Sequence, residues 1–241
     1  MDVMDGHGMP LWRQIYATLA EEMRQGILRP AQRLPTEPEL AERFGVNRHT
    51  LRRAMAALRD DGLVRIERGR GTFVQEEVID YPVTRRTRFS DVMIMSDHEP
   101  GQRALRALEI PADAEVAREL GVAAGEPMLL VETIHEADGR PLSVTAHYFP
   151  KARCEGLLEA YRESGSITQA LYNVGIRDYF RQTTRVTTCL PTETEARHLR
   201  QSPTLPVLLT QSVNVDADGY PVEYSIARHA GQRVALVFKP K

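Results

Sequence analysis

The sequence predicts an α+β protein of two domains, and three features support this. Between residues 36 and 74, two helical segments separated by a Gly turn are followed by a short hairpin. Downstream, a block of helix, strand, Asp-Gly turn and return strand occurs twice, which is typical of an antiparallel sheet. The 241 residues, 42% of them hydrophobic, suffice for two cores. We expect a first domain at 1–76, a linker at 77–84 and a second domain at 85–241.

The two helical segments of the first domain have clear start and stop signals. Thr36 can cap the free N–H groups of a first turn, and Gly45 ends that helix. Asn47 begins the next helix, which should end at Asp60-Asp61-Gly62. Its buried stripe at i, i+4 and i+7 consists of Leu51, Met55 and Leu58. Polar residues therefore project from its first turns, namely Arg48, His49, Thr50, Arg52 and Arg53.

Charge and a wing favour DNA binding over a solvated helix face. The first turns of such a helix enter the major groove, where Arg can form paired hydrogen bonds with guanine. Residues 63–67 alternate like a strand, turn at Gly69 and return through 72–74. Between residues 43 and 70, eight arginines against three acids give +5, in a chain of formal net charge -2. A helix-turn-helix pattern alone is weak evidence, and the wing strengthens it. We expect Arg59 and Arg65 to be surface residues or to pair within the domain, and not to contact DNA.

Residues 10 to 76 resemble the N-terminal domain of the GntR family of bacterial transcriptional regulators. The likeness rests on a helix at 11–25, Leu34-Pro35-Thr36-Glu37, Asn47-Arg48-His49-Thr50-Leu51-Arg52 and the Gly-tipped wing. It implies that Thr36 contacts phosphate and that the wing tip tracks the minor groove. Pro38 stands where several relatives carry a DNA-contacting Arg, so we expect a different operator. The implied DNA-binding residues are Thr36, Arg48, His49, Thr50, Arg52, Arg68, Gly69 and Arg70.

Composition limits where in the cell the protein can lie and whether it can use metal or redox chemistry. No apolar run approaches the roughly 18 residues needed to span a membrane, and the start lacks a signal peptide's regions. We therefore expect a cytoplasmic protein with no membrane partner, associated with the nucleoid when bound to its operator. Cys154 and Cys189 lack metal-ligand spacing, and we interpret them as ordinary reduced residues rather than a redox switch. Neither a metal nor a cofactor is expected.

The second domain contains an internal repeat with an offset of 79 to 80 positions. Each copy is interpreted as a short helix and a hairpin, so the domain would consist of two α-β-β halves joined through 157–175. A cleft between two such halves is a common place for a small ligand. The repeated blocks are 117–120 with 196–199, 126–130 with 205–209, and 137–142 with 217–222.

From about Tyr81 onward the chain resembles the UTRA domain of the HutC subgroup, a chorismate-lyase-like fold that binds an effector without catalysis. Asp80-Tyr81-Pro82 and Thr87-Arg88-Phe89-Ser90 are most similar to PhnF-type regulators of phosphonate utilisation. The resemblance implies effector contacts from Ser166 and from Thr168, which replaces the common Tyr. Related domains that bind phosphorylated ligands usually carry an Arg on the first hairpin strand, and this chain reads Glu132-Thr133-Ile134-His135-Glu136 there.

Side-chain alternation suggests where an effector would bind. Polar residues share one face of the return strands, which predicts either a lined cavity or a solvated face. The helix start after Arg88 suits an anion. Without the usual Arg, His135 would serve as a weaker, pH-sensitive cation, and Glu223 could pair with an amine. The expected effector-binding residues are Arg88, Phe89, Ser90, Thr133, His135, Ser143, Thr145, His147, Ser166, Thr168, Glu223 and Ser225.

The function predicted from these features is that of a homodimeric, ligand-responsive regulator. As a repressor it would bind double-stranded DNA at a palindromic operator and be released by a small anionic effector such as a phosphonate. One alternative is a regulator of the same family that senses a non-phosphorylated catabolite. Others are an enzyme built on the second domain and an architectural DNA-binding protein. No nucleophile motif, metal-ligand spacing or phosphate-binding glycine loop supports an enzyme.

Overall fold

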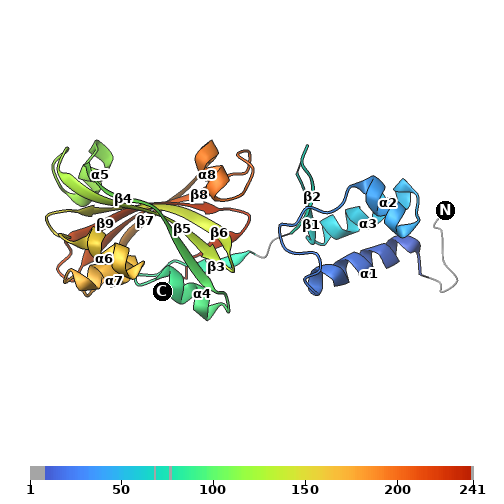
Figure 1. The fold of residues 1–241 in the computed structure, drawn as a ribbon, viewed down its shortest axis with the longest axis horizontal. Helices are drawn as coiled ribbons and strands as arrows, with labels where there is room; N and C mark the ends of the chain where they lie inside the picture. The colour runs from blue at the N-terminus through green and yellow to red at the C-terminus, as the bar shows by residue number, and fades with distance from the viewer. Residues whose placement is uncertain (1–8, 68, 76–77, 240–241) are drawn as a thin grey trace. The chain divides into compact units, whose positions relative to one another are not determined.

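The computed structural model describes residues 9–67, 69–75 and 78–239, which fall into two compact units. The first unit ends at Glu77 and the second begins at Val78 (Figure 1). The expected linker at 77–84 is not irregular throughout, because strand β3 occupies Ile79–Pro82 within it. β3 pairs in parallel with β10 (Val234–Val237), close to the C-terminal end, and so belongs to the second unit.

The first unit is a three-helix module with a hairpin, as the sequence predicts. Gly45 ends α2 at a φ of 63°, and the Asn47 side chain accepts a hydrogen bond from the Thr50 N–H at 2.9 Å. Leu51, Met55 and Leu58 are buried in a core shared with α1 and α2. The elements are α1 (Leu11–Arg24), α2 (Glu37–Phe44), α3 (Arg48–Asp60), β1 (Val64–Glu67) and β2 (Gly71–Val74).

The second unit is built on a six-stranded antiparallel sheet with the strand order β4-β5-β6-β9-β8-β7. This order is symmetric about the β6–β9 pair, as two related halves require. The strands of the first half are β4 (Pro100–Pro111), β5 (Pro127–Ala137) and β6 (Arg140–Pro150). Those of the second half are β7 (Tyr179–Cys189), β8 (Val207–Asp216) and β9 (Pro221–Ala230).

Helices cover both faces of this sheet. α5 (Ala114–Leu120) and α8 (Glu193–His198) lie on one side. On the other side lie α4 (Phe89–Met95) and the connection between the halves, α6 (Leu157–Ser164) and α7 (Ile167–Asn173) (Figure 1). Leu129, Val131 and Phe149 pack against α6 and α7, whereas Met128 on the opposite face packs against α5. Alternation along β5 thus assigns its odd-numbered side chains to the α6–α7 side.

Each copy of the repeat has one strand more than the sequence predicts. The copies are β4-α5-β5-β6 and β7-α8-β8-β9, so the expected α-β-β halves are β-α-β-β halves. β4 and β7 form the two edges of the sheet, and most of their residues remain at least partly exposed. Without one buried face, neither strand has the hydrophobic alternation by which half-buried strands are recognised.

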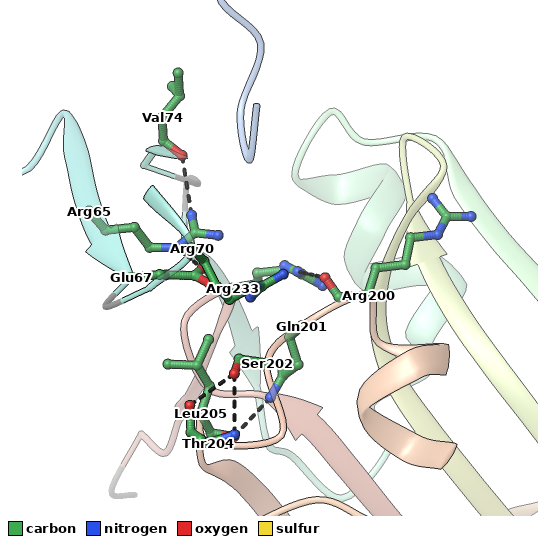
Figure 2. Close-up of polar contacts among 10 residues, drawn as sticks. All are labelled: Arg65, Glu67, Arg70, Val74, Arg200, Gln201, Ser202, Thr204, Leu205 and Arg233. Atoms are coloured by element: carbon green, nitrogen blue, oxygen red, sulfur yellow. Dashed lines mark hydrogen bonds and ion pairs between the residues drawn. The ribbon is translucent and has the colours of Figure 1, made fainter. Parts of the chain in front are cut away.

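A buried arginine ties the end of the chain to the repeat. Arg233, which precedes β10, is 5% exposed. It donates hydrogen bonds to the carbonyl oxygens of Pro141 at 2.8 Å and Leu199 at 2.6 Å. It also donates to the carbonyl oxygen of Arg200 at 3.3 Å (Figure 2). It therefore joins β10, the first hairpin and the end of α8. Among the described residues, no helix has both the length and the apolar character needed to cross a membrane.

Candidate functional site

The candidate DNA-reading surface is the start of α3 together with the wing. Arg48, His49 and Arg52 are exposed, and Thr50 is half-buried. Arg48 has no intramolecular partner among the residues that the structure describes, whereas Nε of Arg52 lies 2.9 Å from Oε2 of Glu37 on α2. At the start of α2, the N–H and the hydroxyl of Thr36 both donate to Glu39, so this hydroxyl is already engaged.

The wing has fewer unpaired positive charges than its sequence suggests, because Glu67 pairs with two of its arginines. Its turn contains Gly69, which has a φ of 77°. Arg70 forms an ion pair with Glu67 and lies over the Phe73 ring. Arg65 contacts the same Glu67 and donates to the Val74 carbonyl at 3.2 Å (Figure 2). The predicted contact residue Arg68 lies outside the described residues.

Arg59 and Arg65, which the sequence assigns to the surface or to pairing within the domain, both pair within it. Arg65 binds Glu67 on the wing, and Arg59 binds Asp60 at 2.7 Å. At the start of α3, Arg52 also pairs, with Glu37, whereas Arg48 has no such partner in the described part of the chain.

In the second unit, a cavity of about 350 Å³ lies on the side of the sheet that α4 and α7 cover. All of the predicted effector residues except Thr133 line it. Thr133 is fully buried, and its Oγ1 lies 3.4 Å from Nε2 of the cavity residue His147. Both Ser166, the N-cap of α7, and Thr168, which lies 3.3 Å from the Tyr179 hydroxyl, are at the rim. The return strands therefore line a cavity and not a solvated face.

Two rows of side chains line the cavity, and within each row the residues are directly paired on neighbouring strands. In the first half, Gln102 is paired with His135, and His135 with Ser143. In the second half, Arg181 on β7 is paired with Asn214, and Asn214 with Glu223. Gln102, Arg181 and Asn214 were not predicted from the sequence. Gln102 and Arg181 lie on the unrecognised edge strands, and Asn214 lies on β8. The β-branched run from 183 to 188 was the available signal for β7.

Two guanidinium groups provide positive charge in the cavity. Arg88 lies over the Tyr179 ring, 4.0 Å from its centroid, and donates to the Tyr179 carbonyl at 3.1 Å. Arg181 lies close enough to Tyr81, a residue of β3, for its positive charge to act on the Tyr81 hydroxyl. Burial raises the pKa of that hydroxyl, and the charge of Arg181 partly opposes the shift. The first strand of the first hairpin, β5, indeed lacks an arginine, but the cavity contains one from β7.

His135 cannot supply the pH-sensitive positive charge that the sequence suggests. Burial lowers its pKa to about 3, and the nearby His147 and His229 add to this effect. The ring stacks on Phe89 with centroids 4.6 Å apart, and its Nδ1 lies 3.4 Å from the Ser143 hydroxyl. His135 therefore lines the cavity as an uncharged side chain at physiological pH. The expectation that it replaces the missing arginine is corrected accordingly.

Glu223 is likewise engaged within the protein. Its Oε1 lies 2.6 Å from Nδ1 of His147, and its Oε2 accepts from Nδ2 of Asn214 at 2.6 Å. Burial alone would raise the pKa of this carboxyl group, but hydrogen bonds from His147 and Asn214 and the charges of His147 and Arg181 lower it overall. The Glu223 carboxylate is thus held ionised by its neighbours, which leaves it poorly placed as the amine partner that the sequence suggests.

Neither metal chemistry nor thiol chemistry is indicated. Within 9–67, 69–75 and 78–239, no cluster of three or more His, Cys, Asp or Glu could hold a metal ion. Cys154 is buried, and burial raises the pKa of its thiol to about 12, so it stays protonated.

Family comparisons agree with both units. Residues 95–235 match the UTRA domain, and residues 11–74 match the bacterial regulatory proteins of the gntR family. The chain belongs to the GntR family. It is a HutC-type GntR/UTRA transcriptional regulator, and not an enzyme.

This GntR/UTRA regulator is similar to several proteins along nearly its whole length. An uncharacterized HTH-type transcriptional regulator of Rhizobium meliloti (strain 1021) is 41% identical, over 95% of this chain and 94% of that protein. The probable transcriptional regulator PhnF of Escherichia coli (strain K12) is 32% identical, over 90% and 89%. The crystal structure of PhnF from Mycobacterium smegmatis matches with a TM-score of 0.64 and 26% identity, over 94% of this chain and 99% of that chain.

Proposed function

We propose that this regulator is a homodimeric repressor that leaves a pseudo-palindromic operator when a small anion binds in its cavity. GntR regulators bind DNA and a small effector. Two relatives carry the name repressor, MngR of Escherichia coli at 28% identity and NagR of Bacillus subtilis at 26%. A single winged module reads only a few base pairs, which favours two modules on two half-sites. The protein would act in the cytoplasm, where its operator lies.

The observation that supports an anionic effector most directly is the charge of the cavity. Arg88 and Arg181 both line it. Of the two acids in the lining, Glu223 is already paired with His147 and Asp91 is exposed at the start of α4. Arg88 and Arg181 thus provide the positive charge available to a ligand. Arginine binds carboxylate and phosphonate oxygens in a planar, two-pronged geometry, so a small phosphonate fits this chemistry. A non-phosphorylated carboxylate is the alternative effector.

Tyr81 could transmit the effect of ligand binding from the cavity to the DNA-binding unit. It belongs to β3, which begins two residues after the boundary between the units. Its ring lies near Phe89 and His229, and the charge of Arg181 acts on its hydroxyl. A ligand that binds Arg181 changes the surroundings of Tyr81, and thereby favours one arrangement of β3. Only such a difference in affinity between two states can shift the operator equilibrium.

A ligand screen on the purified protein tests this proposal. Thermal shifts would be measured with alkylphosphonates, inorganic phosphate, phosphosugars and small carboxylates. We expect stabilisation by phosphonates, and its loss in Arg181→Gln. The matched control is Arg185→Gln, because Arg185 is on the same strand but outside the cavity lining. Stabilisation by no anion, or equal stabilisation of wild type and Arg181→Gln, would contradict the proposed site.

A further inference from the structure

Two buried polar atoms in the cavity wall have no hydrogen-bond partner within the described part of the chain. One is Nε of Arg181, a donor, and the other is Oδ1 of Asn214, an acceptor. Both residues line the cavity, and they are directly paired across β7 and β8. Side chains paired in this way have Cβ atoms only about 5 Å apart. The wall therefore presents one unused donor beside one unused acceptor.

The acceptor cannot be exchanged for a donor by rotating the amide. Nδ2 of Asn214 donates to Oε2 of Glu223 at 2.6 Å. The other carboxylate oxygen of Glu223 is held by His147 at 2.6 Å. Turning the amide over would place Oδ1 against an ionised carboxylate, so its orientation is fixed by this chain of contacts. Oδ1 of Asn214, a buried atom of a cavity-lining residue, is therefore an oxygen that can only accept.

The remaining polar groups of the cavity are less selective. Hydroxyl groups such as those of Ser143, Thr145 and Ser225 can rotate, and each can either donate or accept. Other groups already have partners, for example Thr210 with His229 at 3.1 Å and Thr184 with Ser212 at 3.0 Å. Buried polar groups are nearly always paired in working complexes, so an acceptor without a partner indicates a donor on the ligand.

We infer that the effector carries a hydrogen-bond donor, an ammonium or a hydroxyl group, close to its anionic group, and that Asn214 selects for it. The inference rests on the proposed function, because it concerns the same cavity. The anion accepts from the Arg181 guanidinium, and the neighbouring donor is read by Oδ1 of Asn214. An anion with a purely apolar substituent leaves this acceptor buried and unpaired, which weakens its binding.

The experiment compares three probes of nearly equal size by isothermal titration calorimetry on the full chain. These are 2-aminoethylphosphonate, 2-hydroxyethylphosphonate and n-propylphosphonate. We expect wild type to prefer at least one of the first two over the third by about tenfold or more. A preference for the amine alone would identify an ammonium as the donor, and equal preference a neutral hydrogen bond.

A variant assigns the selectivity to Asn214. In Asn214→Leu we expect the preference over n-propylphosphonate to disappear, whereas a purely structural role would weaken all three probes equally. Gln211→Leu is the matched control, because it replaces an amide on the same strand that contacts Glu115 and lies outside the cavity lining. If Asn214→Leu does not fold, Asn214→Ala replaces it, because alanine also removes the acceptor, and the wild-type comparison stands without either variant.

The outcomes separate this inference from the proposed function. Equal affinities of wild type for the three probes would overturn the role of Asn214 and leave an anion site in place. A preference that persists in Asn214→Leu would also overturn it. Binding of none of the probes at millimolar concentration would contradict the phosphonate site itself, and the inference with it.

Discussion

Replacing Arg48 by Ala tests the proposed recognition surface, and Arg52 provides an internal comparison. Arg48 is exposed and unpaired among the described residues, so it can bind DNA without first breaking an ion pair. A side chain that reads a base contributes about 1–3 kcal/mol, which is roughly five- to 150-fold in affinity. Arg52 must first break its ion pair with Glu37, 2.9 Å away. An exposed pair of this kind stabilises the free protein by about 0.2–1 kcal/mol, which reduces the gain from binding DNA by the same amount. We therefore expect Arg48→Ala to weaken operator binding more than Arg52→Ala.

The assay is fluorescence anisotropy with an operator selected from a random DNA library and with unrelated DNA, at several salt concentrations. Arg59→Ala is the control, because Arg59 lies at the far end of α3 and pairs with Asp60. We expect the Arg48→Ala loss to be confined to the operator, with relaxed base preference. An equal loss on both DNAs would reduce Arg48 to a phosphate contact and refute the reasoning.

Three further predictions concern coupling, pH and local stability. Tyr81→Phe removes the hydroxyl on which the charge of Arg181 acts. It should retain operator and phosphonate binding but lose ligand-induced release, whereas Tyr220→Phe on an exposed turn should behave like wild type. Burial lowers the pKa of His135 to about 3, against about 6.5 in the unfolded chain, so between these values only the unfolded state binds a proton at this ring. The contribution of His135 to stability should therefore be complete above about pH 6.5 and be lost as the pH falls below it. In His135→Phe, the melting temperature should fall less steeply over the same pH range. A slope unchanged by His135→Phe would show that this ring is not buried as a neutral group. Asn47→Ala removes the acceptor for the Thr50 N–H and should cost about 1 kcal/mol in urea unfolding of the first unit; no change would exclude the cap.

The first unit was predictable because its signals are local. The turn at Gly45, the cap at Asn47 and the stripe of Leu51, Met55 and Leu58 each depend on residues a few positions apart. The cavity lining was predictable for a similar reason, because alternation along β6 and β9 assigns Ser143, Thr145, Glu223 and Ser225 to one side of the sheet.

The missed features depend on distant pairing. β4 and β7 lie at the edges of the sheet and have no buried face to produce alternation, so Gln102 and Arg181 were not placed in the cavity. His135 was assigned a charge from its ordinary pKa, which only its burial beside His147 and His229 alters. The contact between His147 and Glu223 joins residues 76 positions apart and gives no local signal.

The most direct test of the central claim is release of operator DNA by a ligand bound in the cavity. A preformed complex with fluorescent operator would be titrated with 2-aminoethylphosphonate, for wild type, Arg181→Gln and Arg185→Gln. We predict that DNA is released from wild type and Arg185→Gln, and retained by Arg181→Gln. Release from all three proteins alike, or bound ligand without release from wild type, would contradict control of the operator through this cavity.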